Sequence, residues 1–125
     1  MAVIGALGSA EAQDGLTKQD LQGPVTVTVA LTALPATGAP ITVRVVLDTH
    51  SVGLDGIAFE KAVAVRTPDG TDLAPTAVEA KGSGHHREAL LVFPPLTSAG
   101  PVRIVVKDVG GVPERSFIWE TPAKP

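Results

Sequence analysis

The chain has 125 residues, a net charge of −3 and no cysteine, and 44% of its residues are hydrophobic. This length suits one domain with a real core, and the composition is too apolar for a disordered chain. The lack of cysteine excludes disulfides, thiolate catalysis, iron–sulfur ligation and thiolate copper sites. The negative charge and the 3% aromatic content argue against nucleic-acid binding.

Residues 1–22 are predicted to form an N-terminal arm or the remnant of a signal peptide. The apolar run Ala2–Gly8 precedes Ala10-Glu11-Ala12, which fits a small-residue cleavage site, although no basic segment comes before it. The alternative is a short N-terminal helix or arm, and we interpret Asp14–Gln22 as a polar lead-in. No stretch approaches the ~20 apolar residues of a membrane span. The sequence therefore predicts a secreted, periplasmic or cell-surface protein that does not span the membrane.

Residues 23–120 are predicted to form a single β domain, followed by an unstructured tail over 121–125. Apolar residues alternate with polar ones in Val25–Thr32 and again in Ile41–Asp48, as in strands with one buried face. Further candidate strands are Ala62–Thr67, Thr71–Leu73, Thr76–Ala80, Glu88–Phe93, Val102–Lys107 and Arg115–Glu120. The segment Ile57–Glu60 is ambiguous, and Pro68-Asp69-Gly70 is a strong tight-turn signal.

The fold predicted from this pattern is an immunoglobulin-like antiparallel β-sandwich of seven or eight strands, with a small closed barrel as the main alternative. The 13 glycines and 11 prolines agree with many turns between short strands. The predicted core contains Val27, Val29, Val43, Val45, Leu91, Ile104 and one of Phe117 or Trp119.

The candidate site begins in the stretch Leu47–Asp55, which holds two carboxylates and a histidine. If Leu47 faces the core, Asp48 and His50 project from the opposite face, about 7 Å apart at their Cα atoms. Asp55 could join them where the loop returns. Imidazole and carboxylate ligands suit Zn²⁺ or Cu²⁺.

The other two histidines, His85 and His86, lie in a glycine-rich segment just before a predicted strand. Antiparallel neighbours place the end of one strand beside the start of the next, so we expect this segment and Asp48–Asp55 at the same end of the sandwich. Adjacent residues of an extended strand point oppositely, so His85 would share a side with Arg87. The predicted metal ligands are His50, His85, His86, Asp48 and Asp55, with Arg87 beside them.

Two other interpretations of these residues stay open. The first is structural: the polar side chains bond to loop backbone, or Asp48 pairs with Arg87. The second is catalysis, because a Ser/His/Asp set can be drawn from Ser83, His50 and Asp48. No nucleophile elbow, zinc-protease motif or phosphate loop accompanies them, so we expect no enzyme. The alternative to metal binding is a structural, adhesive or self-assembling subunit that adds a strand to itself or to another surface protein.

Three short motifs carry a resemblance to known proteins: L-D-T-H-S-V-G-L-D at Leu47–Asp55, G-H-H-R at Gly84–Arg87 and G-G-V-P-E-R at Gly110–Arg115. Their combination resembles a group of small secreted or lipoprotein-type immunoglobulin-like β-sandwich proteins of unassigned function. The resemblance covers most of residues 25–120. It implies a fold and a location but no activity.

Overall fold

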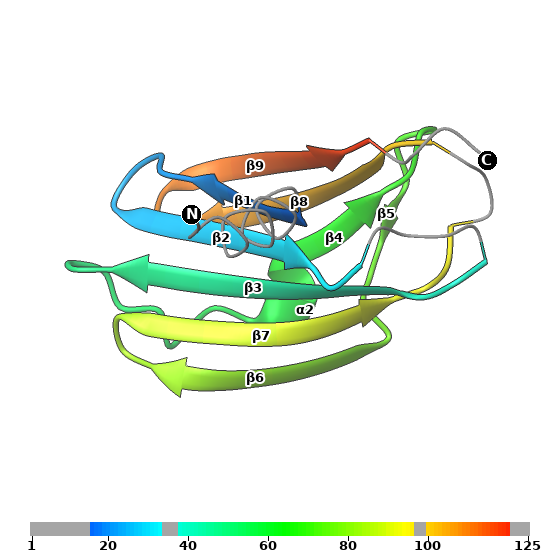
Figure 1. The fold of residues 1–125 in the computed structure, drawn as a ribbon. Helices are drawn as coiled ribbons and strands as arrows, with labels where there is room; N and C mark the ends of the chain where they lie inside the picture. Colours follow the sequence, from blue (N-terminus) through cyan, green and yellow to red (C-terminus); the bar gives the residue numbers. More distant parts are fainter. Residues whose placement is uncertain (1–15, 34–37, 97–99, 121–125) are drawn as a thin grey trace, which may run out of the picture.

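The computed structural model describes residues 16–33, 38–96 and 100–120. Its strands are β1 (Thr17–Asp20), β2 (Val25–Leu31), β3 (Ile41–Thr49), β4 (Val63–Arg66), β5 (Asp72–Leu73), β6 (Ala77–Ser83), β7 (His86–Phe93), β8 (Val102–Val109) and β9 (Val112–Trp119). Sheet A has the order β1-β2-β3-β7-β6, and sheet B has the order β5-β4-β8-β9 (Figure 1). Two packed antiparallel sheets confirm the all-β, sandwich-like prediction at that level.

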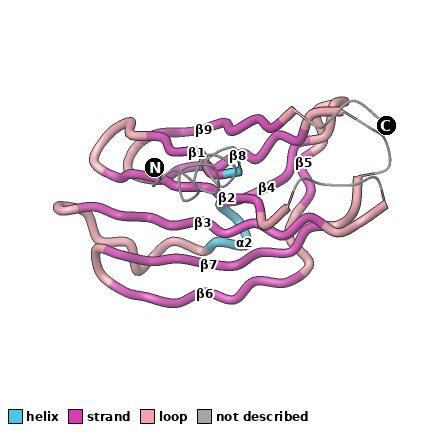
Figure 2. Tube along the Cα trace, in the orientation of Figure 1, coloured by secondary structure: helices cyan, strands magenta, loops and turns pink. Residues whose placement is uncertain are grey.

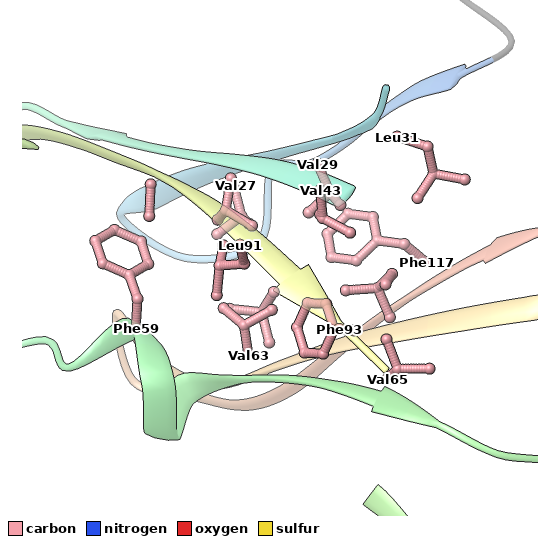
Figure 3. Close-up of a cluster of buried hydrophobic side chains, with 14 of the residues drawn as sticks. Val27, Val29, Leu31, Val43, Phe59, Val63, Val65, Leu91, Phe93 and Phe117 are labelled. Carbon is pink, nitrogen blue, oxygen red and sulfur yellow. The ribbon is translucent and has the colours of Figure 1, made fainter. Parts of the chain in front are cut away.

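The alternation along β2 and β3 explains why these segments form strands. In both, every second residue is buried and the residues between them are partly or fully exposed. The two sheets press these apolar rows together into one core, which Figure 3 shows around Val43, Leu91 and Phe93. All the predicted core residues are buried, and both Phe117 and Trp119 belong to the core.

Several boundaries differ from the sequence prediction. The segment interpreted as a polar lead-in contains β1. Its residues are mostly exposed and show no hydrophobic alternation, so only the backbone ladder with β2 identifies it as a strand. The ambiguous segment Ile57–Glu60 leads into a one-turn helix, α2 (Phe59–Ala62), at the crossover between the sheets (Figure 2). The last strand begins at Val112 instead of Arg115. The described residues thus hold nine strands instead of seven or eight.

One long edge of the sandwich is closed by side chains of β9 that reach the first strand. Arg115 is 1% exposed, and its guanidinium donates to the carboxylate of Asp20 at 3.3 Å and to the carbonyl of Val25 at 2.8 Å. The indole N–H of Trp119 donates to the carbonyl of Leu16 at 3.1 Å. These bonds join sheet B to sheet A where no backbone ladder connects them.

The proposed signal-like stretch at Met1–Gln13 and the tail over 121–125 lie outside the described residues. Within the described part, no helix has the length and apolar character needed to cross a bilayer.

Candidate functional site

The two histidine-bearing segments meet at one end of sheet A. Strand β3 pairs with β7 so that Asp48 lies opposite His86. Beyond the ladder, the N–H of Thr49 donates to the carbonyl of His85 at 3.0 Å. The prediction that these segments share one end of the sandwich is therefore confirmed, for the reason given: they are the end and the start of antiparallel neighbours.

Asp48 and His86 form a pair on the outer face of sheet A. The carboxylate of Asp48 bonds to Nδ1 of His86, and the carboxylate of Glu88 lies 3.6 Å from Nε2 of the same ring. The hydrogen bond to Asp48, followed by its charge, raises the pKa of His86 above the usual value of 6.5. Both side chains remain more than half exposed, so solvent screens the pair.

The raised pKa of His86 predicts how this end of the sheet responds to pH. Protonated His86 stabilises the fold below about pH 6.5, and that contribution is lost as the pH rises through the folded pKa. We expect the His86 ring resonances to titrate with a midpoint above 6.5 in an NMR experiment, and Asp48→Asn to lower that midpoint. Glu60→Gln, at an exposed position of α2, serves as the control. An unchanged midpoint in Asp48→Asn would contradict the pairing.

Asp55 holds the β6–β7 hairpin rather than an open ligand position. Its carboxylate accepts the N–H of Gly84 at 3.0 Å, and the N–H of the preceding Leu54 donates to the carbonyl of Gly84 at 2.9 Å. The hairpin loop is Gly84-His85, with φ of +69° at the glycine, as the first central position of a type II′ turn requires. The loop after β3 and the hairpin are thus bonded together through backbone groups.

Arg87 points inward and closes the crossover loop. Its guanidinium donates to the carbonyls of Leu54 at 3.0 Å and Ile57 at 2.7 Å, and it lies 5.0 Å from the ring centre of Phe59. The alternative pairing of Asp48 with Arg87 is wrong, because neighbouring positions of β7 face opposite sides and His86 takes the outer one. The buried hydroxyl of Thr49 acts similarly and accepts the N–H groups of Ser51 and Val52.

The third motif builds the β8–β9 hairpin and the Arg115 bridge. Gly110 and Gly111 form the two-residue loop between β8 and β9, with φ of +62° and +78°, as a type I′ turn requires. A side chain at Gly110 would meet Val25 Cγ2 at 2.7 Å. The tight turn therefore allows β9 to place Arg115 against β2. The guanidinium of Arg115 also donates to the carbonyl of Val109, at the end of β8, at 2.9 Å.

The five predicted metal ligands are only partly brought together. Asp48 and His86 touch, Asp55 bonds to the hairpin backbone, and His50 and His85 are exposed with no side-chain hydrogen bond or ion pair to another described residue. Across residues 16–33, 38–96 and 100–120, no three His, Cys, Asp or Glu side chains converge as a metal site would need. Metal binding stays a prediction.

Sequence reasoning missed the charged neighbours of His86. Glu88 lies two residues along the same face of β7, and it pairs with Arg44 at 2.8 Å and with Lys81 at 3.3 Å. The period-2 rule applied to His86 would have found Glu88, but the segment was assigned to a loop.

A second charged cluster, on the outer face of sheet B, was also missed. Arg66 pairs with Asp72 at 2.7 Å and Glu114 at 2.9 Å, and Lys107 pairs with Asp72 at 2.6 Å. The Arg66–Glu114 pair joins β4 to β9 across β8, where the outward-facing Val105 is fully buried although it lies outside the core cluster. The cluster covers an apolar position of the sheet.

Taken together, the residues that carried the candidate chemistry divide into two groups. Thr49, Asp55, Arg87 and Arg115 bond to loop or strand backbone, whereas the histidines remain on the surface at the end of sheet A. The geometry offers hydrogen-bonded loop closure and one exposed acid–imidazole pair. No protein-family model matches the chain, and neither a curated protein nor a solved structure shows significant similarity to it.

Proposed function

We propose that this protein is a non-catalytic structural module, an adhesive or self-assembling subunit of the cell surface or extracellular space. The observation that carries the proposal is the use of the motif residues: Asp55 and Arg87 bond to the backbone of the loops around them. A carboxylate and a guanidinium that are committed to fixing loops are not free to act on a substrate. The signal-like residues at the N-terminus support a location at the cell surface or outside the cell. The resemblance of the three short motifs supports an immunoglobulin-like relationship.

Divalent metal binding is the second candidate, and one observation favours it. All three histidines of the chain lie at the same end of sheet A, beside Asp48, and His50 and His85 are exposed. Side-chain rotation could then bring imidazoles to one Zn²⁺ or Cu²⁺ ion. Protons would compete, because a ligating imidazole must be neutral and Asp48 favours the charged form of His86. Affinity would therefore fall as the pH drops.

Calorimetric titration of the untagged protein with ZnCl₂ and CuCl₂ separates the two candidates. The wild type is compared with His50→Ala and with the double variant His85→Ala/His86→Ala. The structural proposal predicts equally weak heats in all three proteins. Stoichiometric binding that disappears in the variants, with a Tm that rises with metal concentration, would replace it with the metal site.

The structural role also predicts a stability effect at the loop. Asp55→Ala removes the acceptor of the Gly84 N–H, and we expect the free energy of unfolding to fall by about 0.5–1.5 kcal/mol. Urea denaturation measures this loss, with Glu60→Ala, at an exposed position of α2, as the matched acid-to-alanine control. Equal stability of the two variants would show that Asp55 does not hold the hairpin, and the proposal would lose its main support.

A further inference from the structure

Strand β6 leaves one long edge of sheet A open (Figures 1 and 2). Ser83 and His86 flank the two-residue hairpin loop and so form a hydrogen-bonded pair, which makes the odd-numbered residues of β6 the ones bonded to β7. The backbone N–H and C=O groups of Val78 and Ala80 consequently point away from the sheet, whereas Gly82, with φ of +91°, departs from the extended conformation. None of them bonds to another described segment. These groups form a template for another strand.

The charges along this edge are arranged in a self-complementary way. Glu79 and Lys81 lie two residues apart and project from the same outer face of sheet A. Lys81 contacts Glu88 at 3.3 Å while its side chain stays 76% exposed. Glu79 is exposed and makes no ion pair with a described residue. Glu79, which pairs with no described base, thus lies beside Lys81, whose exposed ammonium group has room for a second carboxylate.

We propose that β6 pairs antiparallel with β6 of a second copy of this chain, around a two-fold axis at Ala80. In this register Ala80 exchanges both backbone hydrogen bonds with Ala80 of the other copy, and Val78 lies opposite Gly82. Glu79 then faces Lys81 of the second copy at a non-hydrogen-bonded position, where opposite Cα atoms are about 4.5 Å apart. The symmetry makes this ion pair twice.

The same charges exclude neighbouring registers. Sliding one strand by two residues places Glu79 opposite Glu79, or Lys81 opposite Lys81, and like charges directly opposite are destabilising. A lysine on an edge strand also discourages pairing with strands that carry no acid at the matching position. A second copy supplies that acid by symmetry, as an isologous interface requires.

The other sheet edges are less suited to adding a strand. Strand β5 has two residues, and β1 has four. Strand β9 has eight residues, but its side chains Arg115 and Trp119 bond to the first strand, and Pro113 on its open side has no N–H to donate. In the described part of the chain, the seven residues of β6 form a long edge without these features. The inference rests on the proposed structural role, since it names the partner and the contact through which the subunit would assemble.

Sedimentation equilibrium of the full chain over a range of concentrations, up to several hundred micromolar, tests the pairing. The wild type should dimerise, and Lys81→Glu or Glu79→Lys should weaken dimerisation about tenfold, because each replaces two favourable ion pairs with repulsion. The charge-swapped double variant Glu79→Lys/Lys81→Glu should dimerise more tightly than either single variant, although its carboxylate at position 81 faces Glu88 of the same chain. Lys61→Glu, with the same charge change at an exposed position of α2, should leave the dissociation constant unaltered.

A second variant tests the backbone contact. The N–H of Ala80 is not used by β7, so Ala80→Pro removes the central intermolecular bonds while the β6–β7 ladder keeps its own. We expect this variant to be monomeric, and amide exchange at Ala80 in the wild type to slow as concentration rises. A dissociation constant that stays the same in the β6 variants, or a wild type that stays monomeric, would overturn the inference. The structural role itself is judged separately, by the metal titration and the Asp55 variant.

Discussion

Replacing Arg115 with alanine is expected to lower the free energy of unfolding by about 3–5 kcal/mol, as for the loss of one partner of a buried ion pair. The guanidinium is 1% exposed and bonds to the carbonyls of Val25 and Val109 as well as to the carboxylate of Asp20. Truncation leaves these acceptors without a donor at the closed edge of the sandwich. Urea denaturation followed by the fluorescence of Trp119 measures the loss.

The control for this variant is Arg103→Ala on the neighbouring strand β8. Arg103 is exposed, and its one side-chain bond to a described residue is to the hydroxyl of Ser116, at 2.9 Å. Its truncation should therefore change stability by no more than about 0.5 kcal/mol. Arg115→Met keeps much of the packing volume and separates the lost bonds from the lost volume. If Arg115→Ala and Arg103→Ala cost the same, the buried bridge between the sheets does not stabilise the fold.

Leu91→Ala should cost about 2–5 kcal/mol through lost burial and the cavity left behind. Leu91 is completely buried, opposite Val43 in the ladder of β3 and β7 (Figure 3). Its neighbour Leu90 is a matched control, because it lies on the same strand but on the outer face, where it is only partly buried. Leu90→Ala should cost about 1 kcal/mol, as an average substitution does. Similar losses in both variants would contradict the assignment of the two faces of β7.

The alternation of apolar residues was enough to predict which segments form the core. Val25–Leu31 and Ile41–Thr49 show the pattern because each has one buried and one solvated face. Strand β1 has no buried face of its own, so its polar sequence carried no signal. The alternation of faces along β9 also makes the burial of Arg115 predictable, because Arg115 lies on the same face as Phe117 and Trp119.

The candidate site was predicted in its location but not in its contacts. The two loops meet because β3 pairs antiparallel with β7, and such a pair places the end of one strand beside the start of the other. The bonds of Asp55 to Gly84 and of Arg87 to loop carbonyls join side chains to backbone, and such bonds leave no periodic pattern in the sequence. The predicted strand begins at Glu88, whereas β7 begins at His86, so His86 and Arg87 lie within the strand and not before it.

The bridge from β9 to the first strand has a consequence for how the chain folds. The bond from Trp119 to Leu16 spans 103 residues of sequence, and that from Arg115 to Asp20 spans 95. Contacts between residues so distant in sequence make folding slow, because the loop entropy must be lost before they form. During synthesis, β1 can pair with β2 early, but its bonds to the side chains of β9 form only after β9 has left the ribosome. This edge of the sandwich therefore stays open until β9 is available, and the bridge between the sheets closes late in folding.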